Sequence, residues 1–195
     1  MTMTRRFELL KKLVPLLQDE LVISNIGFPS QELYRLGDRK EYFYMLGSMG
    51  MASSIGLGVS LGTHRRVLVI DGDGSVLMNL GTLATIANFG PENYTLLIVD
   101  NGAYGSTGDQ PTHTSGKTDL AAMARGAGVS SVMEVGVADM ADALARARQN
   151  PGPHIIVIRV APGSPSLKPI PLSPVHIRDR FMGELKGDRE RTICA

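Results

Sequence analysis

Residues that could do chemistry follow two apolar runs of the sequence. Asp71-Gly72-Asp73-Gly74-Ser75 comes directly after the first run, and Asp100-Asn101-Gly102-Ala103-Tyr104 comes after the second. A carboxylate, an amide oxygen and a backbone carbonyl are oxygen ligands that suit Mg²⁺, and a diphosphate would supply the remaining oxygens. Glycine lets the backbone approach a phosphate closely, and a helix that starts near Ser75 would point free N–H groups at the anion. We therefore expect a magnesium–diphosphate site with Asp73, Asn101 and the carbonyl of Ala103 as metal ligands.

Other interpretations of the same residues are weaker or stay open. A lone Asp-Gly-Asp-Gly is often only a turn. An EF-hand is excluded because its closing Glu is absent, and a Walker A loop because no Gly-Lys-Ser/Thr follows. The dinucleotide fingerprint fails because Leu77 stands where the third glycine belongs. Asp100 could still imitate the ribose-binding acid, so a noncatalytic dinucleotide-binding module remains the alternative from another class.

Alternation of strands and helices gives the expected fold. The apolar runs that end at Asp71 and Asp100 are typical of strands buried on both faces of a parallel sheet. Strands are expected at 21–25, 66–71, 94–100, 131–135 and 154–160, and helices over 4–18, 48–62, 75–89, 119–127 and 137–149. The pattern predicts an α/β fold: a doubly wound parallel sheet with helices on both faces, whose strand carboxyl ends form the ligand-binding edge. Asp73 and Asn101, 28 positions apart, can then converge.

Composition changes near residue 160. We expect an α/β domain over 1–160 and a Pro-rich C-terminal tail over 161–195, because seven of the eleven prolines lie between Pro151 and Pro174. A short helix is expected near 178–185. The tail suits either a surface strap or an arm that docks a partner, and the sequence does not decide between them.

Composition also excludes several functional classes. The chain has 195 residues and a formal net charge of +1, which argues against a nucleic-acid-binding protein. Its one cysteine, Cys194, rules out a disulfide framework and is expected to be a tail thiol without a role. The absence of a long apolar run or a signal-like start predicts a cytoplasmic protein that does not bind a membrane.

The combined motifs resemble those of a known family. Gly72-Asp73-Gly74-Ser75 followed by Asn101 resembles the thiamine-diphosphate motif, and Leu46-Gly47-Ser48-Met49-Gly50 is similar to the segment that receives the aminopyrimidine ring in thiamine-diphosphate decarboxylases. The stretches SNIGFPSQELY, FYMLGSMGMASSIGLG, VIDGDGSVLMNLGTLATI and DNGAYGSTGDQPTHT look like the β subunits of sulfopyruvate decarboxylases, and phosphonopyruvate decarboxylases share much of the pattern. The resemblance is strong over about residues 20–116 and weaker to about residue 160.

The resemblance implies a role for each matching residue. Asp73, Asn101 and Ala103 would bind Mg²⁺, and the carbonyl of Gly47 would accept a hydrogen bond from the 4′-amino group of the cofactor. Met49 would wedge between the two rings of thiamine diphosphate, although a methionine is by itself more often core filler. The residues expected around the diphosphate are Gly72, Gly74, Ser75 and Tyr104.

The resemblance also implies a partner. Family members use a Glu from a separate pyrimidine-binding domain to activate the cofactor, and no glutamate here lies in such a motif. We therefore expect a hetero-oligomer in which an α-type pyrimidine-binding subunit completes the active site. The implied activity is a lyase reaction, decarboxylation of a small 2-oxo acid: 3-sulfopyruvate to sulfoacetaldehyde and CO₂ in coenzyme M biosynthesis, or alternatively phosphonopyruvate.

A doubly acidic substrate needs hydrogen-bond donors. His113 is the candidate catalytic residue for proton transfer because imidazole titrates near neutrality, although a lone loop histidine is usually only solvated. The residues expected to line the substrate pocket are Ser106, Thr107, Gln110, Thr112, His113 and Thr114.

Overall fold

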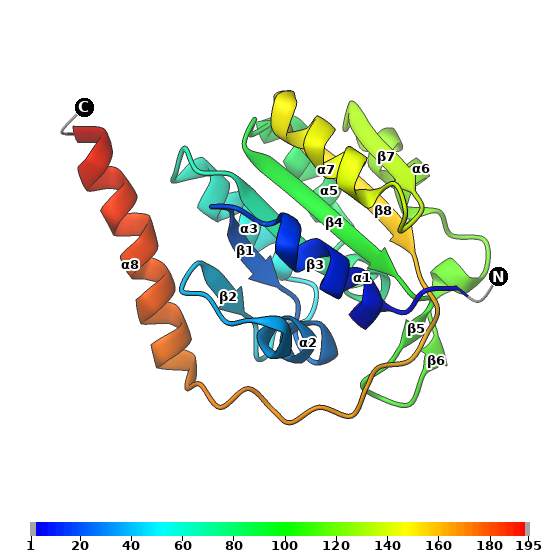
Figure 1. Ribbon diagram of the computed structural model, residues 1–195. Coiled ribbons are helices and arrows are strands. Elements are labelled where there is room, and N and C mark those ends of the chain that lie inside the picture. The colour runs from blue at the N-terminus through cyan, green and yellow to red at the C-terminus, as the bar shows by residue number, and fades with distance from the viewer. Residues whose placement is uncertain (1–2, 194–195) are drawn as a thin grey trace.

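A six-stranded parallel sheet forms the centre of the molecule, with strand order β2-β1-β3-β4-β8-β7 (Figure 1). The computed structural model describes residues 3–193, and side chains through residue 186. The strands are β1 (Leu21–Ser24), β2 (Tyr42–Tyr44), β3 (Val67–Gly72), β4 (Tyr94–Asp100), β7 (Ser131–Val135) and β8 (His154–Arg159). Five of the six match the predicted strands. Strand β2 was not predicted, because three residues are too few to show a period.

Helices cover both faces of the sheet, as the sequence predicts (Figure 1). One face carries α1 (Arg6–Leu13), α2 (Phe28–Leu36) and α7 (Met140–Gln149), and the other carries α3 (Ala52–Leu61), α5 (Gly81–Phe89) and α6 (Leu120–Gly126). Each face has its own core, with Leu10, Leu33 and Leu144 in the first and Leu57, Ile86 and Leu120 in the second. The strands between them are buried on both sides, which explains their continuous apolar runs.

Three predicted helices were wrong in extent. The helix expected over 75–89 is divided into α4 (Asp73–Met78) and α5, because Asn79 leaves helical geometry at φ −143° and ψ 56°. The helix expected over 48–62 begins only at Ala52, because Ser48 and Gly50 have φ values of 61° and 90°, outside the right-handed helical region. The helix expected over 4–18 is α1 followed by a 3₁₀ turn over Val14–Leu16, and α2 was not predicted.

The tail after β8 runs along the surface and then returns to the sheet (Figure 1). No helix or strand lies between β8 and α8 (Pro174–Ile193), which is longer than the short helix expected there. Ile177 and Phe181 are 1% and 3% exposed, so α8 packs against the edge formed by β2. Arg180 of α8 donates hydrogen bonds of 2.6 and 2.7 Å to the carboxylate of Asp38. Cys194 lies outside the described residues.

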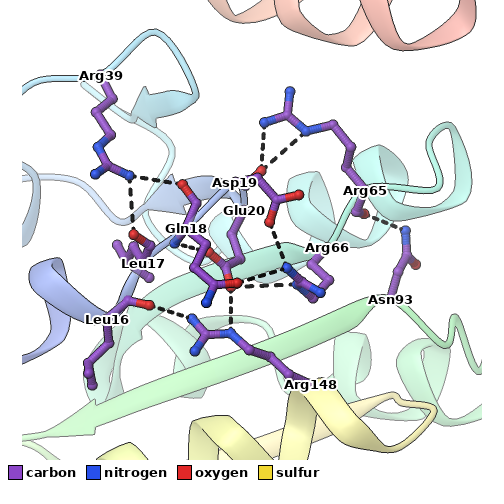
Figure 2. Close-up of polar contacts among 10 residues, drawn as sticks. All are labelled: Leu16, Leu17, Gln18, Asp19, Glu20, Arg39, Arg65, Arg66, Asn93 and Arg148. Atoms are coloured by element: carbon purple, nitrogen blue, oxygen red, sulfur yellow. Dashed lines mark hydrogen bonds and ion pairs between the residues drawn. The ribbon is translucent and has the colours of Figure 1, made fainter. Parts of the chain in front are cut away.

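At the amino ends of the strands, a network of charged side chains joins segments far apart in the sequence (Figure 2). The carboxylate of Glu20 lies 2.7 Å from Nε of Arg148 and 3.6 Å from Nε of Arg66. Arg66 also pairs with Asp19 at 2.6 Å. The segment before β1 is thereby tied to β3 and to α7, at the edge opposite the carboxyl ends of the strands.

No helix within residues 3–193 combines the length and the apolar character needed to cross a membrane.

The packing of α3 on the sheet gives a stability prediction. A Cβ atom at Gly56 would lie 2.1 Å from Cγ2 of Val69, whereas one at Gly58 of the same helix would meet nothing within 4 Å. Gly56→Ala should lower the free energy of unfolding by about 1 to 3 kcal/mol through overpacking. The matched control, Gly58→Ala, should raise it by up to about 1 kcal/mol because alanine favours helix. Urea unfolding checks both variants; equal effects would contradict this packing.

Candidate functional site

Two neighbouring strand ends bring Asp73 and Asn101 together. Strands β3 and β4 pair in parallel with Gly72 opposite Val99, so the residues that follow them meet at one edge of the sheet. The backbone N–H of Asn101 donates a 3.3 Å hydrogen bond to Oδ1 of Asp73. Both side chains are buried, and both line one pocket. They therefore converge on a shared hollow, as their spacing predicts.

Two threonines hold the other oxygen of the Asp73 carboxylate. Oγ1 of Thr112 donates to Oδ2 of Asp73 at 2.5 Å, and Oγ1 of Thr114 lies 3.0 Å from the same oxygen. Thr114 also lies 2.7 Å from Oδ1 of Asp100 and therefore links the two carboxylates. Both threonines are buried, and neither lines the pocket that contains Asp73, although Thr114 lines a neighbouring hollow with Asn101 and Ala103; their predicted place beside the substrate stays a prediction.

The electrostatics of this edge favour a cation. Burial raises the pKa of Asp73, and the neighbouring carboxylate of Asp100 raises it further, against the hydrogen bond from Thr112. Asp100 forms a long ion pair, 3.7 Å, with the exposed Arg159. Among the described residues, Asp73 forms no ion pair. A carboxylate, an amide oxygen and nearby backbone carbonyls form a donor set that fits a hard divalent cation.

The segment from Gly47 to Met51 is fastened to α4. The N–H of Gly50 donates to Oγ of Ser75 at 3.0 Å, and Nδ2 of Asn79 donates to the Gly50 carbonyl at 3.1 Å. Gly50 has a φ of 90°, and a Cβ atom there would lie 3.1 Å from Cβ of Met78, so this position requires glycine. These links hold Met49, which lines the pocket, at a fixed place relative to Asp73.

Tyr104 closes the other side of the pocket. A Cβ atom at Gly74 would lie 2.4 Å from Cε1 of Tyr104, so the missing side chain makes room for this ring. Oδ1 of Asn101 accepts the N–H of Ala103 at 3.2 Å, and Ala103 opens the two-stranded hairpin of β5 (Ala103–Tyr104) and β6 (Gln110–Pro111).

Comparisons with known proteins agree with this geometry. Residues 25–158 match the family of the thiamine pyrophosphate enzyme, C-terminal TPP binding domain. The chain is 45% identical over 181 residues to the sulfopyruvate decarboxylase subunit beta of Methanococcus maripaludis, covering 93% of this chain and 97% of that protein. The chain belongs to the thiamine pyrophosphate enzymes, in the sulfopyruvate decarboxylase β-subunit family.

Two further proteins to which the chain is similar are longer than this chain. The phosphonopyruvate decarboxylase of Streptomyces viridochromogenes is 43% identical over 180 residues, which are 91% of this chain but 45% of that protein. A crystal structure described as a thiamin diphosphate-dependent enzyme from Mycobacterium smegmatis superposes with a TM-score of 0.64 at 20% identity, over 80% of this chain and 31% of the other. That likeness shows the fold of the thiamine pyrophosphate enzymes.

The structure brings most of the predicted site residues of this family member together. The predicted residues that line the pocket with Asp73 and Asn101 are Met49, Gly72, Gly74, Ser75, Ala103, Tyr104, Ser106 and Thr107. Gly47 lies outside that pocket, in a separate hollow with Tyr44, Pro174 and Ile177. Gln110 and His113 are exposed and lie outside the pocket lining, so the structure adds no support for a catalytic His113. The individual roles stay predictions.

The sequence analysis missed site residues whose contacts are with residues far away in the sequence. Asn79 holds the Gly50 carbonyl, and Arg6, at the start of α1, lines the pocket from a segment more than sixty positions before Asp73 in the sequence. Thr112 precedes and Thr114 lies within a 3₁₀ turn over His113–Ser115, and the sequence carries no signal for their shared contact with Asp73.

Asp71 gives a pH-dependence prediction. Its side chain is 1% exposed with Oδ2 unpartnered, and burial raises its pKa to about 6 from 3.8. Because the folded state holds this proton more tightly than the unfolded state, the stability of the metal-free chain should fall as the pH rises from about 4 to 6, by at most about 3 kcal/mol.

Asp71→Asn should remove most of that slope and leave a remainder from Asp73, whose pKa is also raised by burial. The exposed Asp142→Asn should leave the slope intact. Urea unfolding of the metal-free variants at several pH values measures this. A slope of the opposite sign in the unsubstituted chain would contradict a buried, protonated Asp71.

Proposed function

We propose that this chain is the β subunit of a decarboxylase that uses thiamine diphosphate and Mg²⁺ to convert 3-sulfopyruvate to sulfoacetaldehyde and CO₂. The observation that carries the proposal is the convergence of Asp73 and Asn101 on one hollow, in a chain of the thiamine pyrophosphate enzymes. The product would serve coenzyme M biosynthesis, and a cytoplasmic location is part of the proposal.

Different residues around the pocket would bind different parts of the cofactor. Asp73, Asn101 and the Ala103 carbonyl would hold Mg²⁺, with Thr112 and Thr114 fixing the Asp73 carboxylate. The diphosphate would lie beside Gly72, Gly74, Ser75 and Tyr104, Met49 would support the angle between the two rings, and the Gly47 carbonyl would accept the amino group. When bound, thiamine diphosphate supplies the electron sink that accepts the electron pair of the carbon–carbon bond broken as CO₂ leaves.

Two uncharged segments support an α-type pyrimidine-binding partner. Residues 42–63 and 74–91 contain no Asp, Glu, Lys or Arg. In these segments Leu46, Met51 and Met78 are 51%, 42% and 61% exposed. Exposed apolar side chains in uncharged segments are typical of a protein interface. The phosphonopyruvate decarboxylase of S. viridochromogenes, which this chain covers over only 45% of its length, has room for a second such unit in one polypeptide.

The alternatives differ in support. Phosphonopyruvate remains the second candidate substrate, because the similarity to the S. viridochromogenes protein is almost as high as that to the β subunit. A dinucleotide module is disfavoured, because Asp100 is buried and its Oδ1 is occupied by the N–H of Gly102 and by Thr114. A ribose would have only Oδ2 of Asp100 as an acceptor, and that oxygen already lies 3.7 Å from Nε of Arg159.

Calorimetry tests the metal ligand directly. Asp73→Asn should weaken Mg²⁺-dependent binding of thiamine diphosphate by about 10- to 100-fold, because a charged oxygen ligand is lost. Asp109→Asn is the matched control: it is exposed on the nearby loop, and its φ of 55° suits asparagine. Binding by Asp73→Asn as tight as by this control would exclude Asp73 as a ligand.

A reconstitution assay tests the subunit assignment. The isolated chain should show no decarboxylation of 3-sulfopyruvate, and activity should appear when an α-type subunit is added, because the Glu that activates the cofactor is expected there. Release of CO₂ and formation of the aldehyde are the measurements, with phosphonopyruvate as the parallel substrate. Full turnover by the isolated chain would refute the need for a partner.

A further inference from the structure

Arg6 places a cationic side chain in the wall of the cofactor pocket. It is 7% exposed and is the one Lys or Arg among the described residues that line the pocket with Asp73 and Asn101. Neither the family match nor the predicted motifs give it a role. A buried guanidinium beside an expected diphosphate site is a candidate anion ligand.

The guanidinium is held in one orientation by two partners. Nε and Nη2 of Arg6 donate to the two carboxylate oxygens of Glu32 at 2.8 and 3.0 Å, and Nη2 also donates to Oγ of Ser164 at 2.5 Å. Glu32 is fully buried. Within the described part of the chain, Nη1 has no hydrogen bond, so two N–H groups of an oriented guanidinium remain available.

Asn25 supplies a second available donor in the same pocket. Its side chain is 5% exposed, and its Oδ1 accepts the N–H of Ile26 at 2.7 Å. Nδ2 has no hydrogen-bond partner among residues 3–186. It lies on the Gly72 side of the pocket, since a Cβ atom at Gly72 would be 3.7 Å from it. Neither Nδ2 of Asn25 nor Nη1 of Arg6 is among the fully buried atoms without a partner, so both donors are open to the pocket and available to a ligand.

The position of these donors favours the diphosphate end of the site. Arg5, the neighbour of Arg6, lines an adjacent hollow together with Asn101 and Ala103, two predicted metal ligands. Of the segment expected to receive the aminopyrimidine ring, Leu46–Gly50, the first three residues border a different hollow, which neither Arg6 nor Asn25 lines, and Met49 lines the same pocket as both. In addition, α4 has only six residues, so its dipole provides little charge for an anion at its start.

We propose that Nη1 of Arg6 and Nδ2 of Asn25 bind the diphosphate of the cofactor, and that Glu32 and Ser164 are positioning residues for Arg6. The proposal rests on the proposed function, since it presupposes that thiamine diphosphate binds in this pocket. Ser164 belongs to the segment between β8 and α8, so this segment would take part in orienting a cofactor ligand. A sulfonate of the substrate has similar oxyanion chemistry, and the experiment separates the two sources.

The test measures binding of thiamine diphosphate and thiamine monophosphate by calorimetry, with Mg²⁺, in the complex with the α-type subunit. The variant is the double substitution Arg6→Gln with Glu32→Gln, which avoids leaving one charge buried without its partner. We expect about 10- to 100-fold weaker binding of the diphosphate and a smaller loss for the monophosphate, the range for charge-assisted hydrogen bonds. Lys12→Gln, which removes an exposed positive charge from the same helix, is the control and should leave both affinities unchanged.

Asn25→Ala is a second, independent variant that leaves the Arg6–Glu32 pair intact. It should also weaken diphosphate binding, by about 10-fold or more, the loss of a single hydrogen bond to a charged group. Unchanged diphosphate affinity in both variants would overturn the proposal. So would a raised KM for the 2-oxo acid with unchanged cofactor affinity, because the donors would then serve the substrate. Failure of the unsubstituted complex to bind thiamine diphosphate would instead overturn the proposed function, and this inference with it.

Discussion

The carboxylate of Asp73, buried where β3 ends and facing Asn101 where β4 ends, is the interaction on which the site depends. Parallel pairing of the two strands fixes the distance between these residues, and two threonine hydroxyls fix one carboxylate oxygen. Placing this charge out of water next to Asp100 is unfavourable unless a cation joins them. The arrangement is therefore poised for a metal ion, and the proposed Mg²⁺ would remove the conflict between the two carboxylates.

The rest of the pocket is built outward from that carboxylate by contacts that need small residues. Gly74 admits the ring of Tyr104 on one side, and Gly50 admits α4 on the other, where Ser75 and Asn79 tie the two segments together. At the opposite edge of the sheet, ion pairs around Glu20 join the segments that precede the strands (Figure 2). The amino edge is therefore cross-linked, and the carboxyl edge carries the pocket, beside which the uncharged segments 42–63 and 74–91 suit an interface between subunits.

The sequence predicted what depends on local pattern and missed what depends on distant partners. Strands β3 and β4 were recognisable because burial on both faces makes them continuously apolar, and the position of Asp73 and Asn101 follows from the strands. The break between α4 and α5 at Asn79 could not be recognised from the sequence, because the side chain of Asn79 bonds to the carbonyl of Gly50, 29 positions away. Arg6 was missed for the same reason, since its partners Glu32 and Ser164 lie 26 and 158 positions from it.

The most direct test of the account is a crystal structure of the chain with its α-type subunit, thiamine diphosphate and Mn²⁺ in place of Mg²⁺, with the metal located by its anomalous signal. The account predicts one ion about 2.0 to 2.3 Å from a carboxylate oxygen of Asp73, the amide oxygen of Asn101 and the carbonyl of Ala103, bridged to the diphosphate. A metal bound elsewhere, or a diphosphate that contacts neither strand end, would contradict it.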